Sequence, residues 1–222
     1  MPETKRAVIF ANGVLSDPAS ARAALAGGDV VIAADGGARH CRELGIKPDY
    51  LIGDFDSLEP SELEQFEAEG VNILRHPARK DYTDLELAIR HAHSLGANEI
   101  LVLGALGRRW DQTLANLLLP AAGEYAGLQM RLLDAAQEVL LARSGSQLTL
   151  HGQPGDTVSL IPLGGDAHGI TTHGLEYPLQ QETLYFGTTR GVSNALLSET
   201  AMVQLEQGML LCVVIHHTGA LE

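Results

Sequence analysis

The chain has 222 residues, of which 45% are hydrophobic and 19% charged, and its formal net charge at pH 7 is −13. This composition is typical of a folded globular protein, arranged as one large domain or two smaller ones. The negative charge argues against nucleic acid as a partner, because a basic face supplies most of the affinity for a phosphate backbone.

The cysteines and the N-terminus exclude further classes. Cys41 and Cys212 are far apart in sequence, so they form neither a zinc-binding pattern nor a disulfide framework. The first residues lead into a short apolar run, which predicts a strand and not a signal peptide or a membrane span. We therefore expect a cytoplasmic protein without a membrane partner.

The first 137 residues alternate apolar runs with segments of helical spacing. We expect strands at 7–10, 29–34, 50–52, 71–74, 99–103 and 129–133, and helices at 17–25, 38–44, 61–70, 83–95 and 111–119. Ser61 and Glu64 have the spacing of a capping box for the third helix. The alternation predicts a Rossmann-like α/β domain with a mostly parallel sheet, whose ligands gather at the carboxyl ends of the strands.

From residue 138 the pattern changes to short β-rich runs. They lie at 147–150, 157–161, 170–172, 183–186, 201–205 and 209–215, and turn clusters such as 153–156 and 187–191 separate them. No long helical pattern interrupts them, which predicts an all-β sandwich. The expected domains are therefore 1–137 and 138–222.

Asp54 and Asp56 occupy the turn after the strand at 50–52. Residues two apart at a strand end point the same way, so we expect both carboxylates on one side of the turn. At about 4 Å they would repel by about 4 kcal/mol at an effective dielectric near 20, which favours a bound cation such as Mg²⁺. The alternative is that both serve only turn and helix-cap roles.

A second acidic stretch precedes the helix at 83–95. Thr83 and Glu86 have capping-box spacing, and Asp84 lies in the first turn, where a negative charge suits the helix dipole. These structural roles explain Asp81 less well. The same helix start could offer N–H groups to a phosphate while Asp81 and Asp84 hold a metal.

The third candidate is the loop at 104–112. Its glycines let the backbone approach a ligand, Arg108 and Arg109 offer forked donors to phosphate, and Asp111 is a possible N-cap. A solvated surface loop explains the same residues equally well. His91 and His93 do not share a helix face, and we interpret both as surface residues.

Four stretches together resemble the motif set of thiamine pyrophosphokinases. They are Ala34-Asp35-Gly36-Gly37-Ala38, Gly53-Asp54-Phe55-Asp56-Ser57, Lys80-Asp81-Tyr82-Thr83-Asp84 and Gly107-Arg108-Arg109-Trp110-Asp111-Gln112, and the resemblance continues at 186–187 and 191–194. The resemblance implies an α/β domain, a C-terminal β-sandwich and a homodimer with active sites between subunits. It also implies that diphosphate is transferred from ATP to the hydroxyl of thiamine, leaving AMP, with Mg²⁺ required.

The resemblance also assigns roles to residues of this chain. Asp54, Asp56 and Asp84 would hold Mg²⁺, and with Asp81 they form the expected catalytic set. Contacts to the nucleotide would come from Asp35, Gly36, Gly37, Ser57, Thr83, Arg109, Asp111 and Gln112. Ser193 and Asn194 of the β domain would meet thiamine from the partner subunit.

The chain departs from the family pattern at two positions. Many bacterial relatives have a second glycine at the position of Arg108 and a histidine at the position of Gln112. The glutamine resembles what eukaryotic members carry. The β domain has no tryptophan to stack on thiamine, so Tyr185 or Phe186 would do this or simply belong to the core.

Two alternatives to a thiamine pyrophosphokinase remain. One is a related pyrophosphokinase for another hydroxymethyl heterocycle such as a pterin, and the other is a catalytically silent nucleotide- or thiamine-binding protein.

Overall fold

The chain folds into two compact units of different architecture. The computed structural model describes residues 5–107 and 109–217. The units meet in sequence between Ala135 and Ala136. Strands and helices alternate in the first unit, and the second is built almost wholly from strands. In the described part of the chain, no helix combines the length and apolar character needed to cross a membrane.

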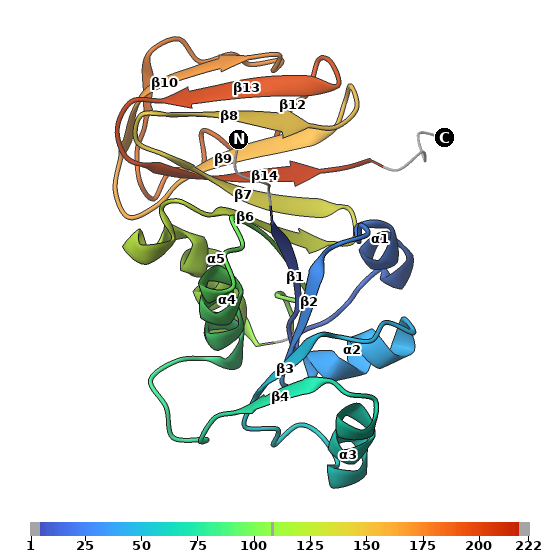
Figure 1. Cartoon of the computed structure of the whole chain (residues 1–222). Helices are drawn as coiled ribbons and strands as arrows, with labels where there is room; N and C mark the ends of the chain where they lie inside the picture. The colour runs from blue at the N-terminus through green and yellow to red at the C-terminus, as the bar shows by residue number, and fades with distance from the viewer. Residues whose placement is uncertain (1–4, 108, 218–222) are drawn as a thin grey trace. The chain divides into compact units, whose positions relative to one another are not determined.

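The first unit is built on a parallel sheet, whose strands run from blue to green in Figure 1. The strands are β1 (Arg6–Phe10), β2 (Val30–Ala34), β3 (Tyr50–Gly53), β4 (Asn72–Arg75), β5 (Glu99–Leu103) and β6 (Gln129–Asp134). They lie in the order β6-β5-β1-β2-β3-β4, and all neighbouring pairs are parallel. The chain moves outward from β1 to β4 and then returns to β5 beside β1. This reversal creates a crevice outside the carboxyl ends of β1 and β5.

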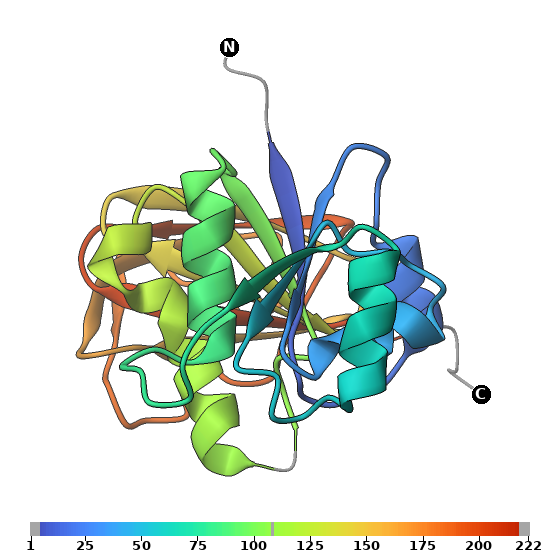
Figure 2. The same ribbon diagram turned by 60° about the horizontal axis from the view of Figure 1, so that its bottom comes forward.

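Helices cover both faces of this sheet. They are α1 (Pro18–Ala23), α2 (Gly37–Glu43), α3 (Pro60–Ala68), α4 (Asp84–Ser94) and α5 (Trp110–Leu118), and short 3-10 turns follow at Leu119–Ala121 and Gly123–Tyr125. Figure 2 shows α4 on the opposite side of the strands from α2 and α3. Val8 and Phe10 of β1 share a core with Cys41 of α2 and Phe66 of α3. The predicted α/β class is confirmed, and coverage of both faces explains why the strands are almost entirely apolar.

The start of α3 differs from the expectation. Its capping box consists of Glu59 and Glu62, not of Ser61 and Glu64, and the Glu62 carboxylate accepts the Glu59 N–H at 2.8 Å. Pro60 occupies the first helical position, where its missing N–H would have no partner within the helix anyway. The proline therefore sets the helix start two residues earlier than the Ser-x-x-Glu spacing indicated.

Two further side chains differ from the expectation. Arg109 is the N-cap of α5, so Asp111 lies inside the first turn and is not the cap.

His91 is half-buried on α4 and packs edge-on against the Tyr50 ring, with 4.5 Å between ring centroids. The surface interpretation is therefore wrong for His91, whereas His93 is exposed. Burial, with a smaller electrostatic contribution from His76, lowers the pKa of His91.

The second unit consists of two antiparallel sheets. Its strands are β7 (Gln137–Arg143), β8 (Ser146–His151), β9 (Thr157–Pro162), β10 (Ala167–His173), β11 (Glu182–Leu184), β12 (Asn194–Ala195), β13 (Thr200–Leu205) and β14 (Met209–Ile215). One sheet has the order β12-β9-β14-β7 and the other β11-β10-β13-β8. Leu160 and Val214 of the first sheet share a core with Ile170 and Val203 of the second. The predicted sandwich is confirmed, although the strand β7 was not expected.

Asp156 is a buried carboxylate that joins distant parts of the second unit. Its side chain accepts the backbone N–H groups of Gln153 and His217, each at 2.8 Å. It also lies 2.9 Å from Nδ1 of His216, whose Nε2 is 3.6 Å from Glu138. Burial acts to raise the pKa of Asp156, but the hydrogen bonds and the His216 ring outweigh it, so the pKa lies below its ordinary value.

We expect Asp156→Asn to reduce the free energy of unfolding by about 1–3 kcal/mol, because the amide turns a donor toward buried N–H groups. A lowered carboxyl pKa stabilises the fold above the unfolded-state pKa, and this stability is lost as the pH falls through the folded-state pKa. The wild type should therefore lose stability below about pH 4, and the variant should lose less. Urea unfolding across this range tests both effects, with the exposed Glu199→Gln as control. Equal stability of Asp156→Asn and wild type at neutral pH would contradict the assignment.

The start of α2 is pressed against the end of β1. A Cβ on Gly37 would lie 2.0 Å from the carbonyl oxygen of Phe10, and a Cβ on Gly36 would lie 2.2 Å from Oδ1 of Asn12. The preceding residue, Asp35, has a φ of 47°, so β2 turns sharply into α2. The two glycines allow this turn to lie directly against β1.

We expect Gly37→Ala to reduce the free energy of unfolding by about 1–3 kcal/mol, because the methyl group overlaps a backbone oxygen that has no room to move. The matched control is Gly127→Ala, since a Cβ there meets nothing within 4 Å. Thermal or denaturant unfolding of both variants is the measurement. A Gly37→Ala protein as stable as the Gly127→Ala protein would show that the contact relaxes without cost.

Candidate active site

A cavity of about 580 Å³ lies at the carboxyl ends of the strands of the first unit. The predicted site residues that line it are Asp35, Asp54, Asp56, Ser57, Thr83, Asp84, Arg109 and Gln112. The loop after β1, at 11–14, and the loop after β5, at 105–107, form other parts of its wall. The cavity therefore lies where the strand order reverses, the usual ligand position in an open α/β sheet.

Asp35, Asp54 and Asp56 form a three-carboxylate group, which we call the acidic group. Each contributes one carboxylate oxygen, and these oxygens lie within 4.8 Å of one another. Asp35 is 4% exposed, and among the described residues its Oδ1 has no hydrogen-bond partner. Carboxylates this close repel one another, and an unpartnered buried oxygen is costly unless a ligand or cation reaches it. The donor set is all oxygen, so it fits a hard divalent cation such as Mg²⁺.

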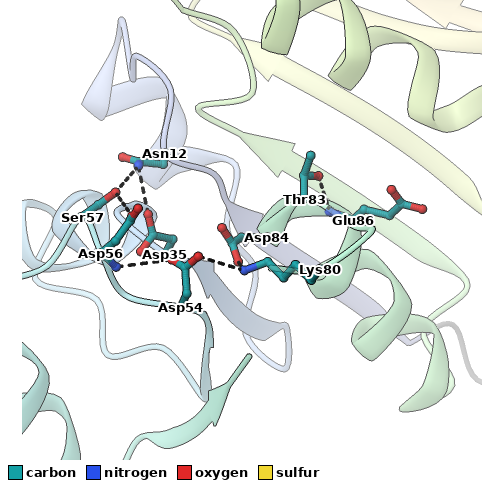
Figure 3. A network of polar contacts seen from close by, with 9 residues as sticks. All are labelled: Asn12, Asp35, Asp54, Asp56, Ser57, Lys80, Thr83, Asp84 and Glu86. Carbon is teal, nitrogen blue, oxygen red and sulfur yellow. Dashed lines mark hydrogen bonds and ion pairs between the residues drawn. The ribbon is translucent and has the colours of Figure 1, made fainter. Parts of the chain in front are cut away.

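Hydrogen bonds hold the acidic group together, as Figure 3 shows. Nδ2 of Asn12 donates to Oδ2 of Asp35 at 3.2 Å and to Oγ of Ser57 at 3.0 Å. The Ser57 hydroxyl in turn donates to Asp56 at 3.2 Å, and the Asp56 N–H donates to Asp54 at 3.3 Å. Asn12 thus connects the loop after β1 to the turns after β2 and β3.

Lys80 lies on the other side of Asp54. Its ammonium is 3.3 Å from Oδ2 of Asp54 and 2.7 Å from Oδ1 of Asp84, as Figure 3 shows. Its side chain is only 12% exposed. Lys80 therefore joins the turn after β3 to the first residue of α4, and it supplies a positive charge beside the acidic group.

The pKa values of these three groups follow from burial and from their contacts. Burial acts to raise the pKa of Asp54, but the Asp56 N–H and the Lys80 ammonium outweigh it and lower the pKa. Burial acts to lower the pKa of Lys80, but Asp84 and Asp54 raise it. Asp84 is more deeply enclosed, so burial raises its pKa in spite of Lys80, and the charges of Asp54 and Asp35 add to this.

The N-terminus of α4 opens onto the cavity. Thr83 is the N-cap, and its Oγ1 accepts the N–H of Glu86 at 3.2 Å, which confirms its predicted capping role. Asp84 and Leu85, the first residues of the helix, line the cavity with Thr83. This end of an 11-residue helix carries a partial positive charge and free N–H groups, which suits a phosphate.

Arg109 and Asp111 pair with each other in the loop after β5. Nε of Arg109 donates to Oδ1 of Asp111 at 3.1 Å, and Nη2 donates to Oδ2. This pairing raises the pKa of Arg109 and lowers that of Asp111. Of the two, Arg109 lines the cavity. Arg108, the other predicted phosphate donor, lies outside the described residues.

Six predicted site residues are not among those that line the cavity. They are Gly36, Gly37, Asp81, Asp111, Ser193 and Asn194. The two glycines have a packing role against β1, and Asp81 is exposed. Ser193 and Asn194 belong to the second unit.

Ser193 and Asn194 form part of a short turn and strand in the second unit. Ser193 is exposed and has a φ of 64°, and its N–H donates to Oγ of Ser159 at 3.2 Å. The Asn194 side chain bonds both backbone groups of Tyr177, accepting its N–H at 3.0 Å and donating to its carbonyl at 2.8 Å. Asn194 therefore has a structural role of its own, whereas Ser193 is exposed.

The aromatic side chains proposed to stack on thiamine are both at the surface. Tyr185 is 59% exposed and Phe186 is 60% exposed. The alternative interpretation of these rings as core residues is therefore wrong. The physical reason is that β11 ends at Leu184, so both aromatics belong to the loop that follows the strand.

Sequence reasoning missed three residues that shape the site. Asn12 had a visible signal, because it is a polar residue two positions after a buried strand, close to the place that Asp35 takes after the next strand. Lys80 stood inside a motif, but nothing in the sequence indicated that it would reach Asp54. Asn116 is buried on α5 and donates to the carbonyl of Ala105 at 2.6 Å, a contact that only the fold creates.

Comparison with known proteins places both units in one family. Residues 22–129 match the family model described as thiamin pyrophosphokinase, catalytic domain. Residues 146–210 match the model described as thiamin pyrophosphokinase, vitamin B1 binding domain. The two matched regions lie in the first and second units respectively.

Curated relatives and solved structures agree with these matches. The chain is 29% identical to thiamine pyrophosphokinase of Bacillus subtilis, over 82% of this chain and 85% of the relative. It is 28% identical to thiamine pyrophosphokinase 2 of Arabidopsis thaliana, over 78% of this chain and 67% of the relative. The crystal structure of the Bacillus subtilis protein superposes with a TM-score of 0.85 at 26% identity, covering 96% of this chain and 100% of that one. With the cavity and its carboxylates, these matches show that the chain belongs to the thiamine pyrophosphokinase family.

Proposed function

We propose that this chain transfers diphosphate from ATP to the hydroxyl of thiamine, giving thiamine diphosphate and AMP. The observation that carries the proposal is the acidic group at the crevice of the first unit, with its unpartnered Asp35 oxygen, in a chain that matches both thiamin pyrophosphokinase family models. No observation favours a pterin-like acceptor, and the presence of all the predicted carboxylates argues against a silent binding protein.

The acidic group supports Mg²⁺ as the cofactor. Asp54, Asp56 and Asp84 would hold the ion, as the resemblance implies, and Asp35 of the acidic group would be a further ligand. Asp54, Asp56 and Asp84 are also expected to act in catalysis. The bound ion would neutralise charge on the polyphosphate and polarise the phosphorus that is attacked. Asp81, exposed in the loop that leads into α4, stays a proposed member of the catalytic set.

The remaining cavity residues would bind and orient ATP. The α4 N-terminus at Thr83 presents N–H groups, and Arg109 can exchange its Asp111 partner for a phosphate in the same forked geometry. Asn12 and Ser57 hold the carboxylates of Asp35 and Asp56 in place through hydrogen bonds. Because phosphoryl transfer depends mainly on position and charge, these residues would align the β-phosphorus for in-line attack. Gly36, Gly37 and Gln112 complete the proposed nucleotide site.

We further propose that the second unit binds thiamine and forms a homodimer, so that Ser193 and Asn194 meet thiamine bound at the partner's cavity. The match of residues 146–210 to a vitamin B1 binding domain supports this role for the second unit. The exposed Tyr185 and Phe186 offer aromatic surface for a heterocycle. The cytoplasmic location stays a prediction.

The reaction is tested by AMP formation from ATP and Mg²⁺, with thiamine and with a panel of other hydroxymethyl heterocycles that includes a pterin. Thiamine-dependent AMP supports the proposal. AMP formed only with another acceptor would support a related pyrophosphokinase, and the absence of AMP with every acceptor would support a silent binding protein.

We expect Asp54→Asn and Asp56→Asn each to reduce kcat/KM by at least about a hundredfold, since changes even to residues behind a metal ligand cost about 10–100-fold. Asp56→Asn should not destabilise the metal-free protein, because it removes one charge from a repelling group. Asp54→Asn should destabilise it, because the Asp54 carboxylate pairs with the Lys80 ammonium at 3.3 Å and has a lowered pKa in the folded protein. Steady-state kinetics at saturating Mg²⁺ and thermal unfolding without it are the measurements. The control is Glu67→Gln, which removes an exposed charge from α3. Turnover near the wild-type rate in either aspartate variant would show that the metal assignment is wrong.

We also expect an inactive Asp56→Asn chain and an inactive chain carrying Ser193→Ala and Asn194→Ala to recover activity when refolded together. A two-fold dimer presents the same pair of surfaces twice, so a heterodimer contains one site with both halves intact. Such a mixture should regain about a quarter of wild-type activity, because half of the dimers are mixed and each holds one intact site of two.

The second chain must be checked for folding, because Asn194 also braces Tyr177. Thermal unfolding of the doubly substituted protein provides this control. Verified heterodimers without recovered activity would place the whole site within one subunit.

A further inference from the structure

We propose that Lys80 and a divalent cation compete for Asp54, so that binding of the metal breaks the ion pair between Lys80 and Asp54. This inference rests on the proposed metal site and concerns what the chain's own lysine does before and after the metal arrives.

The first step is that Asp54 belongs to two arrangements at once. It supplies one carboxylate oxygen to the acidic group, within 4.8 Å of oxygens from Asp35 and Asp56. Its Oδ2 also lies 3.3 Å from the Lys80 ammonium. Its Oδ1 accepts the Asp56 N–H at 3.3 Å, so a divalent cation bound to Asp54 would lie close to the ammonium on Oδ2.

The second step is the distribution of charge. Asp35, Asp54, Asp56 and Asp84 surround a space that one ammonium, that of Lys80, partly neutralises. A divalent cation on the acidic group would share Asp54 with this ammonium, and like charges at such separations repel. The lysine side chain is 12% exposed, so water screens this repulsion less than at an open surface.

The third step is that Lys80 has a second partner. Its ammonium is closer to Asp84, at 2.7 Å, than to Asp54. The lysine therefore need not become unpaired when it leaves Asp54. Lys80 belongs to the loop at 76–83 that leads from β4 into α4, so loss of the Asp54 contact would remove the link that this side chain makes between the loop and the turn after β3.

The first test measures metal affinity directly, without activity. Mn²⁺ serves as the probe, and its binding to the metal-free full-length chain is followed by electron paramagnetic resonance. We expect Lys80→Met to bind Mn²⁺ more tightly, on the order of tenfold, because the competing cation is gone. Lys80→Arg should stay close to wild type because it keeps the charge. Lys47→Met, which removes a lysine outside the cavity lining, controls for the change in net charge.

The second test measures whether the Lys80 ammonium leaves Asp54 when the metal binds. The other lysines of the chain are Lys5 and Lys47, so they serve as internal references for acylation by an amine-reactive reagent followed by mass spectrometry. Saturating Mn²⁺ should raise the acylation rate of Lys80 severalfold relative to both references. Asp54→Asn removes a proposed metal ligand together with the ion pair, so the same Mn²⁺ concentration should leave the Lys80 rate unchanged in that protein, which ties the effect to Mn²⁺ at the acidic group.

The outcomes distinguish this inference from the proposed function. If wild type and Lys80→Met bind Mn²⁺ equally tightly, or if Mn²⁺ leaves Lys80 acylation unchanged while it binds, the competition is overturned and the metal site stands. If neither protein binds Mn²⁺ more tightly than its Asp54→Asn form, the metal site itself is overturned, and the competition with it.

Discussion

The mutual repulsion of carboxylates at the ends of β2 and β3 is the constraint on which the rest of the site depends. Asp35, Asp54 and Asp56 are brought within 4.8 Å of one another, and one buried oxygen among them lacks a hydrogen-bond partner in the described structure. A fold would not keep such an arrangement for stability, since buried charges without partners are costly. It is best understood as a site that is completed by a cation.

The first unit holds these charges together with rigid backbone contacts and with neutral donors. Gly37 lets α2 lie against β1, and Asn12 bridges Asp35 and Ser57 through its amide group. Lys80 compensates part of the charge from the far side of Asp54. The acidic group can therefore exist in a folded protein before any ligand binds, at the cost of a strained turn at Asp35.

In the second unit, a buried carboxylate connects the elements that carry the exposed turn with Ser193 and Asn194. Asp156 fixes the end of β14 to the turn before β9. β9 then pairs with β12, which includes Asn194. The positions proposed to meet thiamine thus depend on a buried carboxylate that itself takes no part in the proposed chemistry. These successive contacts from Asp156 through β9 to β12 couple the stability of the sandwich to the geometry of its exposed turn.

The class of both units, the alternating elements of the first unit and the carboxylates after its strands could all be predicted from the amino-acid sequence. These features follow from local periodicity and from residues adjacent in the chain, such as Asp54 and Asp56. Arg108 is not described by the structure, so its role stays a prediction. Only the tertiary structure decided that Asp35 joins Asp54 and Asp56, that Lys80 stands between Asp54 and Asp84, and that Asn12 connects them. The reason is that strands distant in sequence become neighbours only when the sheet forms, and contacts across strand ends leave no periodic trace in the chain.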